Sequence, residues 1–403
     1  MAYAQSAGMG FFSLDEELEL QPGKLTPKGR ERLIRLSGWM PFRQATELFS
    51  EFTGIRLSKL VSQRGAEAAG RVYEEMQEAE AQELLEKKPR PSAKPKKIQI
   101  SADGAMVPLL HGVWAEVRTL VVGEVQAPVK EKGEIVVHTR NLSYFSRKVS
   151  SQQFETLALV EMHRRGVENA QAVAAVMDGA EWLQTFTDYH CPQALRILDF
   201  PHAAEHISPF GDFLHGEQTA ENKTWLREHL HQLKHEGPAR LLADFQKLQR
   251  KHPTIELICN NLAYLKKREA QMQYPAFQAQ GWPIGSGIVE SGNKLVVEAR
   301  LKGSGMHWAE HNVNPILALR NLICSNRWQA DWIKIEARLR SRKKKNATPE
   351  QPRALSGDEA LLLILKEKQT DTQTPTTKKS KSNPWRNFKH GKALFQRSLP
   401  PKL

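Results

Sequence analysis

The chain has 403 residues, of which 40% are hydrophobic and 26% are charged, so it is long enough for two or three globular domains. Its 58 Lys and Arg outnumber 45 Asp and Glu, and the formal net charge of +13 favours a polyanionic partner such as nucleic acid. The three cysteines are far apart, which argues against a disulfide framework or a CxxC zinc site.

Residues 1–24 carry no clear periodicity, and we expect a loose N-terminus there without a secretory signal. No stretch of the sequence approaches the ~18–20 apolar residues of a membrane span, so no membrane partner is expected. These features, together with the scarcity of cysteine, predict a protein of the reducing cytoplasm.

Residues 25–90 are predicted to be helical because their apolar residues recur at helical spacing. Gly54 is placed to end one helix, and Ser58 is placed to cap a short one. This order is typical of a helix-turn-helix, whose last helix enters the DNA major groove, although a plain three-helix bundle has the same pattern. In the DNA-binding version, the side chains that contact DNA are Gln63 and Arg64.

The segment from Arg71 to Lys88 is rich in Glu, Gln, Ala and Leu, which predicts one solvated helix. The basic, Pro-rich segment 88–95 that follows predicts a domain boundary.

Beyond this boundary the sequence alternates between strand-like and helical patterns, which predicts an α/β domain. The predicted strands cover residues 98–100, 114–125, 135–137, 173–177 and 195–198. A helix is predicted at 151–165, and three helices are predicted between residues 202 and 274. Residues 285–328 begin in a Gly-rich turn and continue as helix, and a polar tail is predicted from residue 338.

Three carboxylates stand in Gly-containing polar segments of this basic chain. Asp103 and Asp178 each end an apolar, strand-like run, and Glu290 opens a helix-like one. Phosphodiester cleavage needs an activated nucleophile and a stabilised negative charge, which two Mg²⁺ ions about 3.5–4 Å apart provide. Since Mg²⁺ prefers oxygen ligands, the set predicts phosphoryl transfer on nucleic acid. Each segment alone is more often a turn or a first helical turn.

The segments around these carboxylates resemble the DDE transposases of bacterial insertion sequences of the ISKra type, relatives of the Mutator-like group. Residues 101–109 are similar to the first catalytic segment of that family, and residues 178–182 to the second. Residues 197–206 are similar to the Cys/Asp-x-x-His segment that follows the second. Residues 285–291 with 299–308 resemble the third segment and are the most specific match.

The resemblance spans about residues 25–330 and implies a ribonuclease-H-like α/β catalytic core with an all-helical insertion, preceded by a helix-turn-helix region. The separation 290−178=112 between the last two carboxylates leaves room for that insertion. The implied division is a loose N-terminus at 1–24, a helical DNA-binding region at 25–90, the first part of the core at 96–202, the insertion at 203–278, the final part of the core with the Glu-bearing helix at 279–330, and a basic, largely disordered tail at 331–403.

The resemblance also implies that Asp103, Asp178 and Glu290 are the catalytic residues and hold two Mg²⁺ ions, for which Mn²⁺ substitutes. Asp199 also follows a predicted strand and competes with Asp178 for the middle position. The order of segments in the family favours Asp178. His202 would support a ligand or orient the scissile phosphate, although a solvated histidine is the plainer interpretation.

Basic and aromatic residues of the third segment are candidates for DNA contact. The resemblance implies that they contact the DNA backbone or a flipped base. The side chains of Arg300 and Lys302 are equally consistent with a solvated basic face. The residues concerned are Arg300, Lys302 and Trp308.

Together these features predict a transposase that cuts DNA at the ends of an insertion sequence and joins the freed 3′-hydroxyl to target DNA. Its partners would be double-stranded DNA at the terminal inverted repeats and at the target, and binding two ends implies a homodimer or larger complex. A nucleoid-associated place in the bacterial cytoplasm follows. The alternatives are a non-catalytic DNA-binding regulator derived from a transposase and a glycosidase with paired carboxylates. The positive charge and the 7% aromatic content argue against the glycosidase.

Overall fold

The computed structural model describes residues 25–131 and 133–347 of the chain. The predicted loose N-terminus at 1–24 and the predicted tail beyond residue 347 lie outside the described residues. Within these ranges, no helix is long and apolar enough to cross a bilayer.

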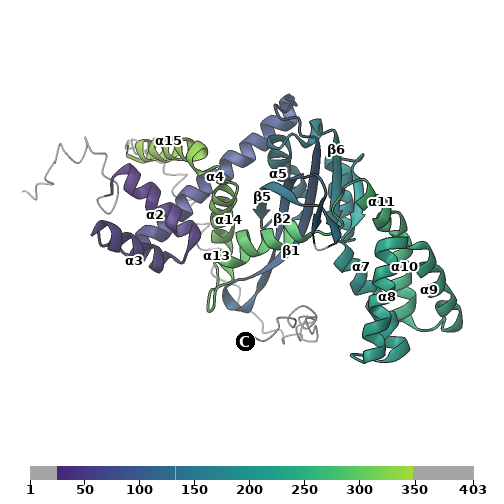
Figure 1. The fold of residues 1–403 in the computed structure, drawn as a ribbon. Helices are drawn as coiled ribbons and strands as arrows, with labels where there is room; N and C mark the ends of the chain where they lie inside the picture. Colours follow the sequence, from purple (N-terminus) through teal and green to yellow (C-terminus); the bar gives the residue numbers. More distant parts are fainter. Residues whose placement is uncertain (1–24, 132, 348–403) are drawn as a thin grey trace, which may run out of the picture. The chain divides into compact units, whose positions relative to one another are not determined.

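A mixed five-stranded sheet organises the fold (Figure 1). Its strands are β1 Lys97–Pro108, β2 Trp114–Val125, β5 Thr139–Arg147, β6 Ala172–Met177 and β7 Leu195–Leu198. They stand in the order β5-β2-β1-β6-β7, in which β1, β2 and β5 are antiparallel neighbours and β1, β6 and β7 are parallel neighbours. The predicted α/β class is therefore confirmed, and the strand order is compatible with a ribonuclease-H-like core.

The strand predicted at residues 135–137 is confirmed as β4 (Glu134–Val136). It pairs with β3 (Val129–Glu131) in a separate hairpin and is not part of the five-stranded sheet. The third strand of the sheet is β5, which the sequence pattern missed because all of residues 143–147 are buried. Burial on both faces removes the alternation that identifies a strand with one solvated face.

Side chains of α14 (Glu310–Cys324) satisfy the outer edge of β5. Asn321 accepts a hydrogen bond from the backbone amide of Ser146 at 2.9 Å and donates to its carbonyl at 3.0 Å. Asn314 does the same for Lys148, at 2.7 and 3.2 Å. An unpaired strand edge is a template for pairing with another chain, so these amides protect the sheet.

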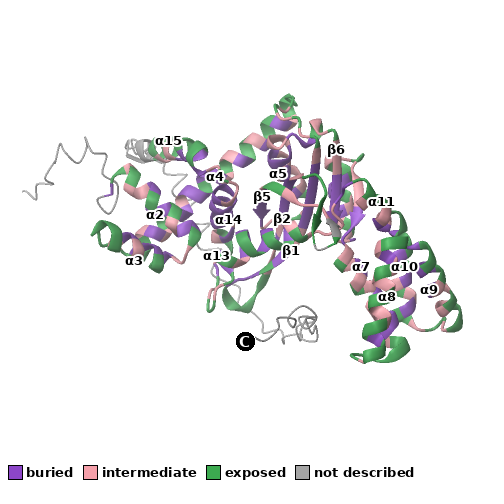
Figure 2. Ribbon diagram, in the orientation of Figure 1, coloured by how far each residue is buried: buried purple, intermediate pink, exposed green. Residues whose placement is uncertain are grey.

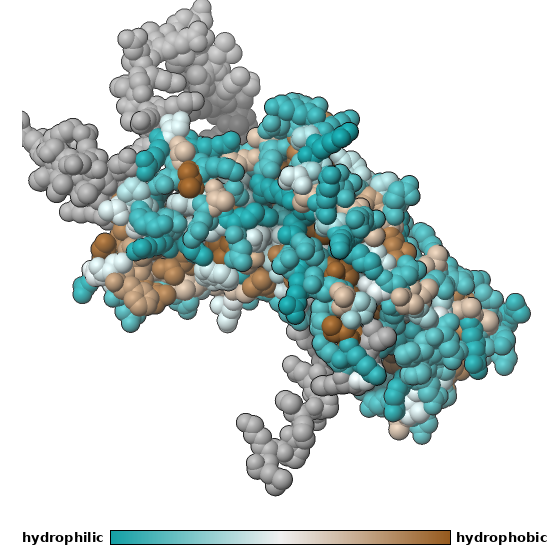
Figure 3. All heavy atoms as spheres, turned by 45° about the horizontal axis from the view of Figure 1, so that its top comes forward, coloured by the Kyte–Doolittle hydropathy of each residue, from teal (hydrophilic) through white to brown (hydrophobic). Residues whose placement is uncertain are grey.

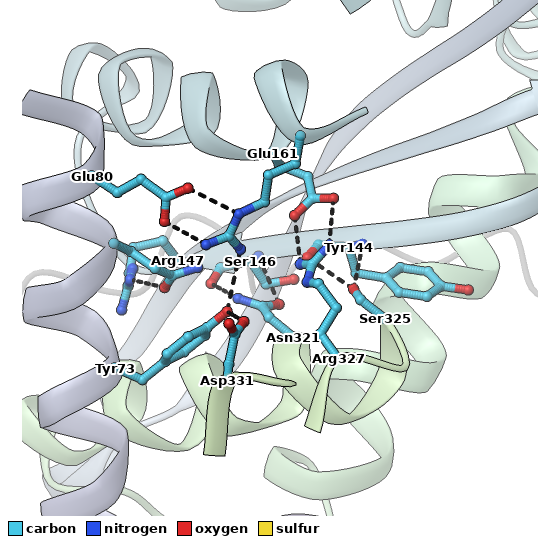
Figure 4. Close-up of polar contacts among 12 residues, drawn as sticks. Tyr73, Glu80, Tyr144, Ser146, Arg147, Glu161, Asn321, Ser325, Arg327 and Asp331 are labelled. Atoms are coloured by element: carbon cyan, nitrogen blue, oxygen red, sulfur yellow. Dashed lines mark hydrogen bonds and ion pairs between the residues drawn. The ribbon is translucent and has the colours of Figure 1, made fainter. Parts of the chain in front are cut away.

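Buried ion pairs connect this edge to the surrounding helices (Figure 4). Arg327, just before α15 (Trp328–Ala347), donates to both carboxylate oxygens of Glu161 on α5 (Ser151–Arg164), at 2.9 and 2.6 Å. Tyr73 donates to Asp331 at 2.9 Å.

The polar tail predicted from residue 338 is partly wrong, because α15 continues as helix to Ala347.

The two faces of β1 serve different layers, as the alternation of strand side chains requires. Ile98 and Ile100 pack with α5 and α6 (Glu181–His190) in one hydrophobic cluster. Ala105 and Val107 belong to another cluster on the opposite face, formed with the N-terminal and C-terminal helices. Asp103 has the same parity as the second pair, so its side chain lies on the side of the C-terminal helices.

The N-terminal helices are α2 (Pro27–Trp39), α3 (Phe42–Thr53) and α4 (Lys59–Lys87). Gly54 ends α3 in a left-handed conformation with φ 72°, as predicted. The predicted short helix after Ser58 and the predicted solvated helix from Arg71 are instead one helix of 29 residues, α4. Only one of its faces is solvated, because Tyr73 and its neighbours on the other face pack in the same hydrophobic cluster as Val107 of β1.

Residues 200–279 form a helical segment of α7 (Phe200–His215), α8 (Ala220–Glu236), α9 (Ala239–Lys251), α10 (Glu256–Lys267) and α11 (Tyr274–Ala279). The three predicted helices correspond to α8, α9 and α10. Their apolar faces meet in a separate cluster that also includes Ile197 and Leu198 of β7. Figure 2 shows these buried inner faces and the exposed outer faces of the same helices.

The continuous helix predicted after the Gly-rich turn is interrupted in the structure. It consists of α12 (Gly287–Gly292), a π-helical turn η4 (Asn293–Glu298) and α13 (Ala299–Leu301), and a loop precedes α14. A π-helical turn inside a helix often marks a functional position. Here it follows directly on the turn that carries Glu290.

Candidate active site

Strand register brings Asp103 and Asp178 close to each other. The pairing of β1 and β6 ends with Ile100 and Ala175, and three residues further along each chain (100+3=103, 175+3=178) Asp178 is level with Asp103. The charge of Asp178 also raises the pKa of Asp103, which agrees with this placement. Asp178 follows the end of β6, as predicted. Asp103 does not end its strand, because β1 continues to Pro108 in pairing with β2.

The carboxylate of Asp103 is partly buried and held on both oxygens. Its Oδ1 accepts from the Gly104 amide at 2.6 Å, and its Oδ2 accepts from Nδ2 of Asn293 at 3.1 Å. Burial raises the pKa of Asp103 to about 6, and the neighbouring charges of Asp178 and Glu116 add to this rise, while the two hydrogen bonds oppose it.

These two aspartates fit a divalent cation. The Oδ1 of Asp178 accepts from the Ala180 amide at 2.7 Å, and within residues 25–131 and 133–347 neither Asp103 nor Asp178 has a Lys or Arg partner. A pair of carboxylates at close range without a countercharge is costly, and a cation with oxygen ligands removes that cost.

Glu290 is not part of this pair in the structure. It lies in the first turn of α12, its side chain is 69% exposed, and its Oε1 accepts from Lys294 at 2.5 Å. Asn293 stands three residues later and reaches Asp103, so the turn with Glu290 packs against β1. Among the residues that the structure describes, no group of three or more His, Cys, Asp and Glu is placed to hold a metal ion.

Asp199 is 8% exposed and both of its oxygens accept backbone hydrogen bonds. Oδ2 caps α7 by accepting from the His202 amide at 3.2 Å, and Oδ1 accepts from the Ser286 amide at 2.6 Å. Burial raises the pKa of Asp199, and these hydrogen bonds oppose the rise. Asp199 therefore fixes the turn before α12, and the geometry favours Asp178 as the neighbour of Asp103.

His202 lies on the first turn of α7, within the helical segment, and does not contact Asp103. Its Nδ1 is 3.4 Å from Glu205, and its ring is edge-on to His206 with centroids 5.2 Å apart. No contact with Asp103 or Asp178 is present among the described side chains, so the structure gives His202 a place in α7 packing.

Arg300 and Trp308 were expected to contact DNA, but both are buried, at 1% and 7% exposure. The guanidinium of Arg300 lies between the rings of Phe42 and Trp308, 4.7 and 5.1 Å from their centroids, and donates to the Ser37 carbonyl at 2.9 Å. Burial lowers the pKa of Arg300 to about 10. This corrects the expectation, because neither side chain reaches the surface in this arrangement.

The other three expected DNA contacts stay predictions. Arg64 is exposed on α4, while Gln63 donates to Glu67 at 2.9 Å. Lys302 pairs with Glu298 at 2.7 Å. Figure 3 shows a largely hydrophilic face with a hydrophobic area over the N-terminal helices. The large apolar side chains that are exposed in residues 25–90 are Trp39, Phe52, Ile55 and Leu60.

Asn293, Tyr264 and Arg268 contact the two-aspartate site or its loop, and the sequence did not identify them. Asn293 had a signal, since it stands three residues after Glu290 and hence on the same helix face. Tyr264 and Arg268 had none, because their positions depend on the packing of α10 against the loop after β6.

No protein-family model matches the chain, and no curated protein matches it either. The geometry of the site and the chemistry of its residues therefore carry the functional argument.

Proposed function

We propose that the chain is a DDE-type DNA transposase that cuts and joins DNA strands at the ends of an insertion sequence in a metal-dependent reaction. The observation that supports this most is that Asp103 of β1 stands level with Asp178, just after the adjacent parallel strand β6, and that neither has a Lys or Arg partner in the described part of the chain. The strand order, compatible with a ribonuclease-H-like core, and the resemblance of the three carboxylate segments also support it.

In this proposal Asp103 and Asp178 hold Mg²⁺ or Mn²⁺, and Glu290 joins them by leaving Lys294. An exposed ion pair of this kind contributes little to stability, so it does not prevent the move. Bound Mg²⁺ would activate the attacking hydroxyl group and neutralise charge on the phosphate. Asn293 orients Asp103, and Asp199 fixes the turn from which the Glu290 helix starts.

The partner in this proposal is double-stranded DNA, both at the terminal repeats and at the target. The net charge of +13 supports a polyanion as partner. The N-terminal helices would provide end recognition as a helix-turn-helix, and the helical segment would be an insertion in the core. The need to hold two DNA ends implies a dimer or larger complex. In this proposal the complex acts in the bacterial cytoplasm, associated with the nucleoid.

The test is strand cleavage and strand transfer by the purified full chain on labelled terminal DNA of the element that encodes it, with Mg²⁺ or Mn²⁺. Wild type should cut and join, and the variants Asp103→Asn, Asp178→Asn and Glu290→Gln should bind the same DNA without cutting it. Asp244→Asn is the matched control, since Asp244 pairs with Lys247 on α9, away from the two aspartates. Binding without any cleavage by wild type would replace the enzyme with a DNA-binding regulator.

A further inference from the structure

The loop after β6 is in close contact with the helical segment. Gly179 follows Asp178 directly, and a Cβ atom there would lie 2.0 Å from Nε of Arg268 and 2.1 Å from the hydroxyl oxygen of Tyr264. Gly179 is therefore required by the approach of two side chains from α10 and its C-terminal end.

Arg268 is 5% exposed and donates from Nη2 to the carbonyl oxygen of Gly179. The same nitrogen lies 3.3 Å from Glu181, whose side chain is 71% exposed and also pairs with Lys267. Nε of Arg268 has no hydrogen-bond partner among the described residues. Burial of the Arg268 guanidinium costs desolvation energy, and an exposed carboxylate such as Glu181 offsets little of that cost. The hydrogen bond to the Gly179 carbonyl therefore helps to hold the guanidinium in its buried position.

The ring of Tyr264 packs against this guanidinium. The ring centroid lies 3.9 Å from the guanidinium carbon of Arg268, and the ring stacks on that of His206 with centroids 3.6 Å apart. The Nδ1 of His206 is in turn 2.8 Å from Asn261. The stack His206, Tyr264 and Arg268 thus joins α7 and α10 to the loop that carries Asp178.

One peptide group transmits this contact to the carboxylate. The carbonyl that Arg268 binds and the amide that Asp178 accepts from belong to the same planar unit between Gly179 and Ala180. Fixing the carbonyl end of a rigid plane fixes the direction of its N–H at the other end. The orientation of the Asp178 carboxylate therefore depends on Arg268.

We propose that Arg268, held in place by Tyr264, is a positioning residue that aims the Asp178 carboxylate at the cation shared with Asp103. This inference rests on the proposed function, because it assigns a cation to the two aspartates. Partners that orient a metal ligand from outside typically contribute 10–100-fold in metal affinity.

The sign of the effect separates positioning from simple electrostatics. Arg268 is a positive charge near Asp178, so its removal should tighten divalent-cation binding if charge alone matters. Positioning predicts the opposite, because loss of the guanidinium frees the Gly179 peptide and with it the carboxylate.

The experiment measures Mn²⁺ binding to the full chain without DNA, by electron paramagnetic resonance of free Mn²⁺. Arg268→Met should weaken binding by about 10-fold or more. The control Arg227→Met removes an exposed Arg of α8 and should leave the affinity unchanged. Unchanged or tighter binding in Arg268→Met, with a wild-type circular dichroism spectrum, overturns the proposal.

A second variant decides the matter if Arg268→Met does not fold. Gly179→Ala keeps every charge but drives the new methyl group into Arg268 and Tyr264, so it should also weaken Mn²⁺ binding about 10-fold. Gly65→Ala is its control, since the added Cβ meets Ile34 at an ordinary 3.4 Å. Wild-type affinity in Gly179→Ala overturns the proposal.

Failure of this inference and failure of the proposed function give different results. If wild type does not bind Mn²⁺ through Asp103 and Asp178, both fall. If wild type binds and the Arg268 and Gly179 variants bind equally well, only the positioning role falls. If those variants bind more weakly but wild type never cuts DNA, the positioning role stands and the transposase falls.

Discussion

Asp178 and Asp199 each stand one residue after the end of a strand, and those strands, β6 and β7, are parallel neighbours. Asp178 accepts one backbone hydrogen bond within its own turn and faces Asp103. Asp199 accepts one from α7 and one from the turn before α12. Equivalent positions in the sheet thus carry an open carboxylate in one case and a saturated one in the other.

The difference lies in which amides surround each carboxylate. A carboxylate has room for several hydrogen bonds, and those already used by buried amides are not free for a metal ion or substrate. Arg300 makes a similar point for a cation, because its Nε donates to the Ser37 carbonyl and its guanidinium packs against the rings of Phe42 and Trp308 in the interior. The predictions below test this division between open and saturated charges.

The largest effect should separate the two aspartates. Asp178→Asn should lower strand cleavage by ~10³-fold or more, since loss of one metal ligand removes several kcal/mol of transition-state stabilisation. Asp199→Asn keeps an oxygen acceptor and should lower cleavage far less. Rates on labelled terminal DNA with Mg²⁺ check this, with Asp244→Asn as control. Equal losses at positions 178 and 199 would end the distinction.

Arg300→Ala should destabilise the fold and leave DNA affinity intact. Removing a buried side chain between the rings of Phe42 and Trp308 leaves a cavity, for which we expect a loss of ~2–4 kcal/mol in the free energy of unfolding. Urea unfolding measures this. The salt dependence of DNA binding provides the contrast, since loss of a phosphate contact would reduce its slope by about 1. A reduced slope with unchanged stability would return Arg300 to the DNA interface.

Asp199→Ala should also destabilise the fold, by ~1–3 kcal/mol. It removes the N-cap of α7 and leaves the Ser286 amide without its acceptor. Thermal and urea unfolding check the loss, and Asp199→Asn should recover part of it. Wild-type stability in Asp199→Ala would mean that the cap and the turn are not held by this carboxylate.

Asp103 should make the fold less stable as the pH rises. Its folded pKa of about 6 lies above the usual pKa of 3.8 for an aspartate, so the unfolded chain releases its proton first and stability is lost between about pH 4 and 6. Asp103→Asn removes this titrating carboxyl group and with it the loss of stability. Its unfolding free energy minus that of wild type should rise by ~1–2 kcal/mol from pH 4 to pH 7, measured without divalent cations. A difference independent of pH would exclude a raised pKa.

The sequence predicted the elements that have a strong local pattern and missed those that depend on tertiary packing. Residues 114–125 and 195–198 were predicted as strands and are strands, because their apolar runs end at clear turn residues. β5 was missed because α14 covers its edge and buries its polar residues. The span of α4 was underestimated, because Tyr73 and its neighbours are held by packing that composition does not report.

The sequence identified the two aspartates of the candidate site but not how the chain brings them together. Asp103 and Asp178 come together because β1 and β6 pair in parallel, and that pairing was not predicted. Burial of Arg300 and the contact of Arg268 with Gly179 depend on helices far away in sequence. Charge and spacing did not reveal which side of the fold those helices occupy.

The smallest effect concerns the exposed ion pair of Glu290 and Lys294. Both side chains are more than 60% exposed, so Lys294→Ala should leave the free energy of unfolding close to that of wild type. If Lys294 only pairs with Glu290 until DNA and Mg²⁺ bind, Lys294→Ala should also leave the rate of strand cleavage within a few-fold of wild type. Urea unfolding and cleavage rates on terminal DNA measure the two effects, with Lys247→Ala, which removes the exposed partner of Asp244 on α9, as the matched control. A large loss of cleavage in Lys294→Ala alone would make Lys294 a DNA contact next to the two aspartates.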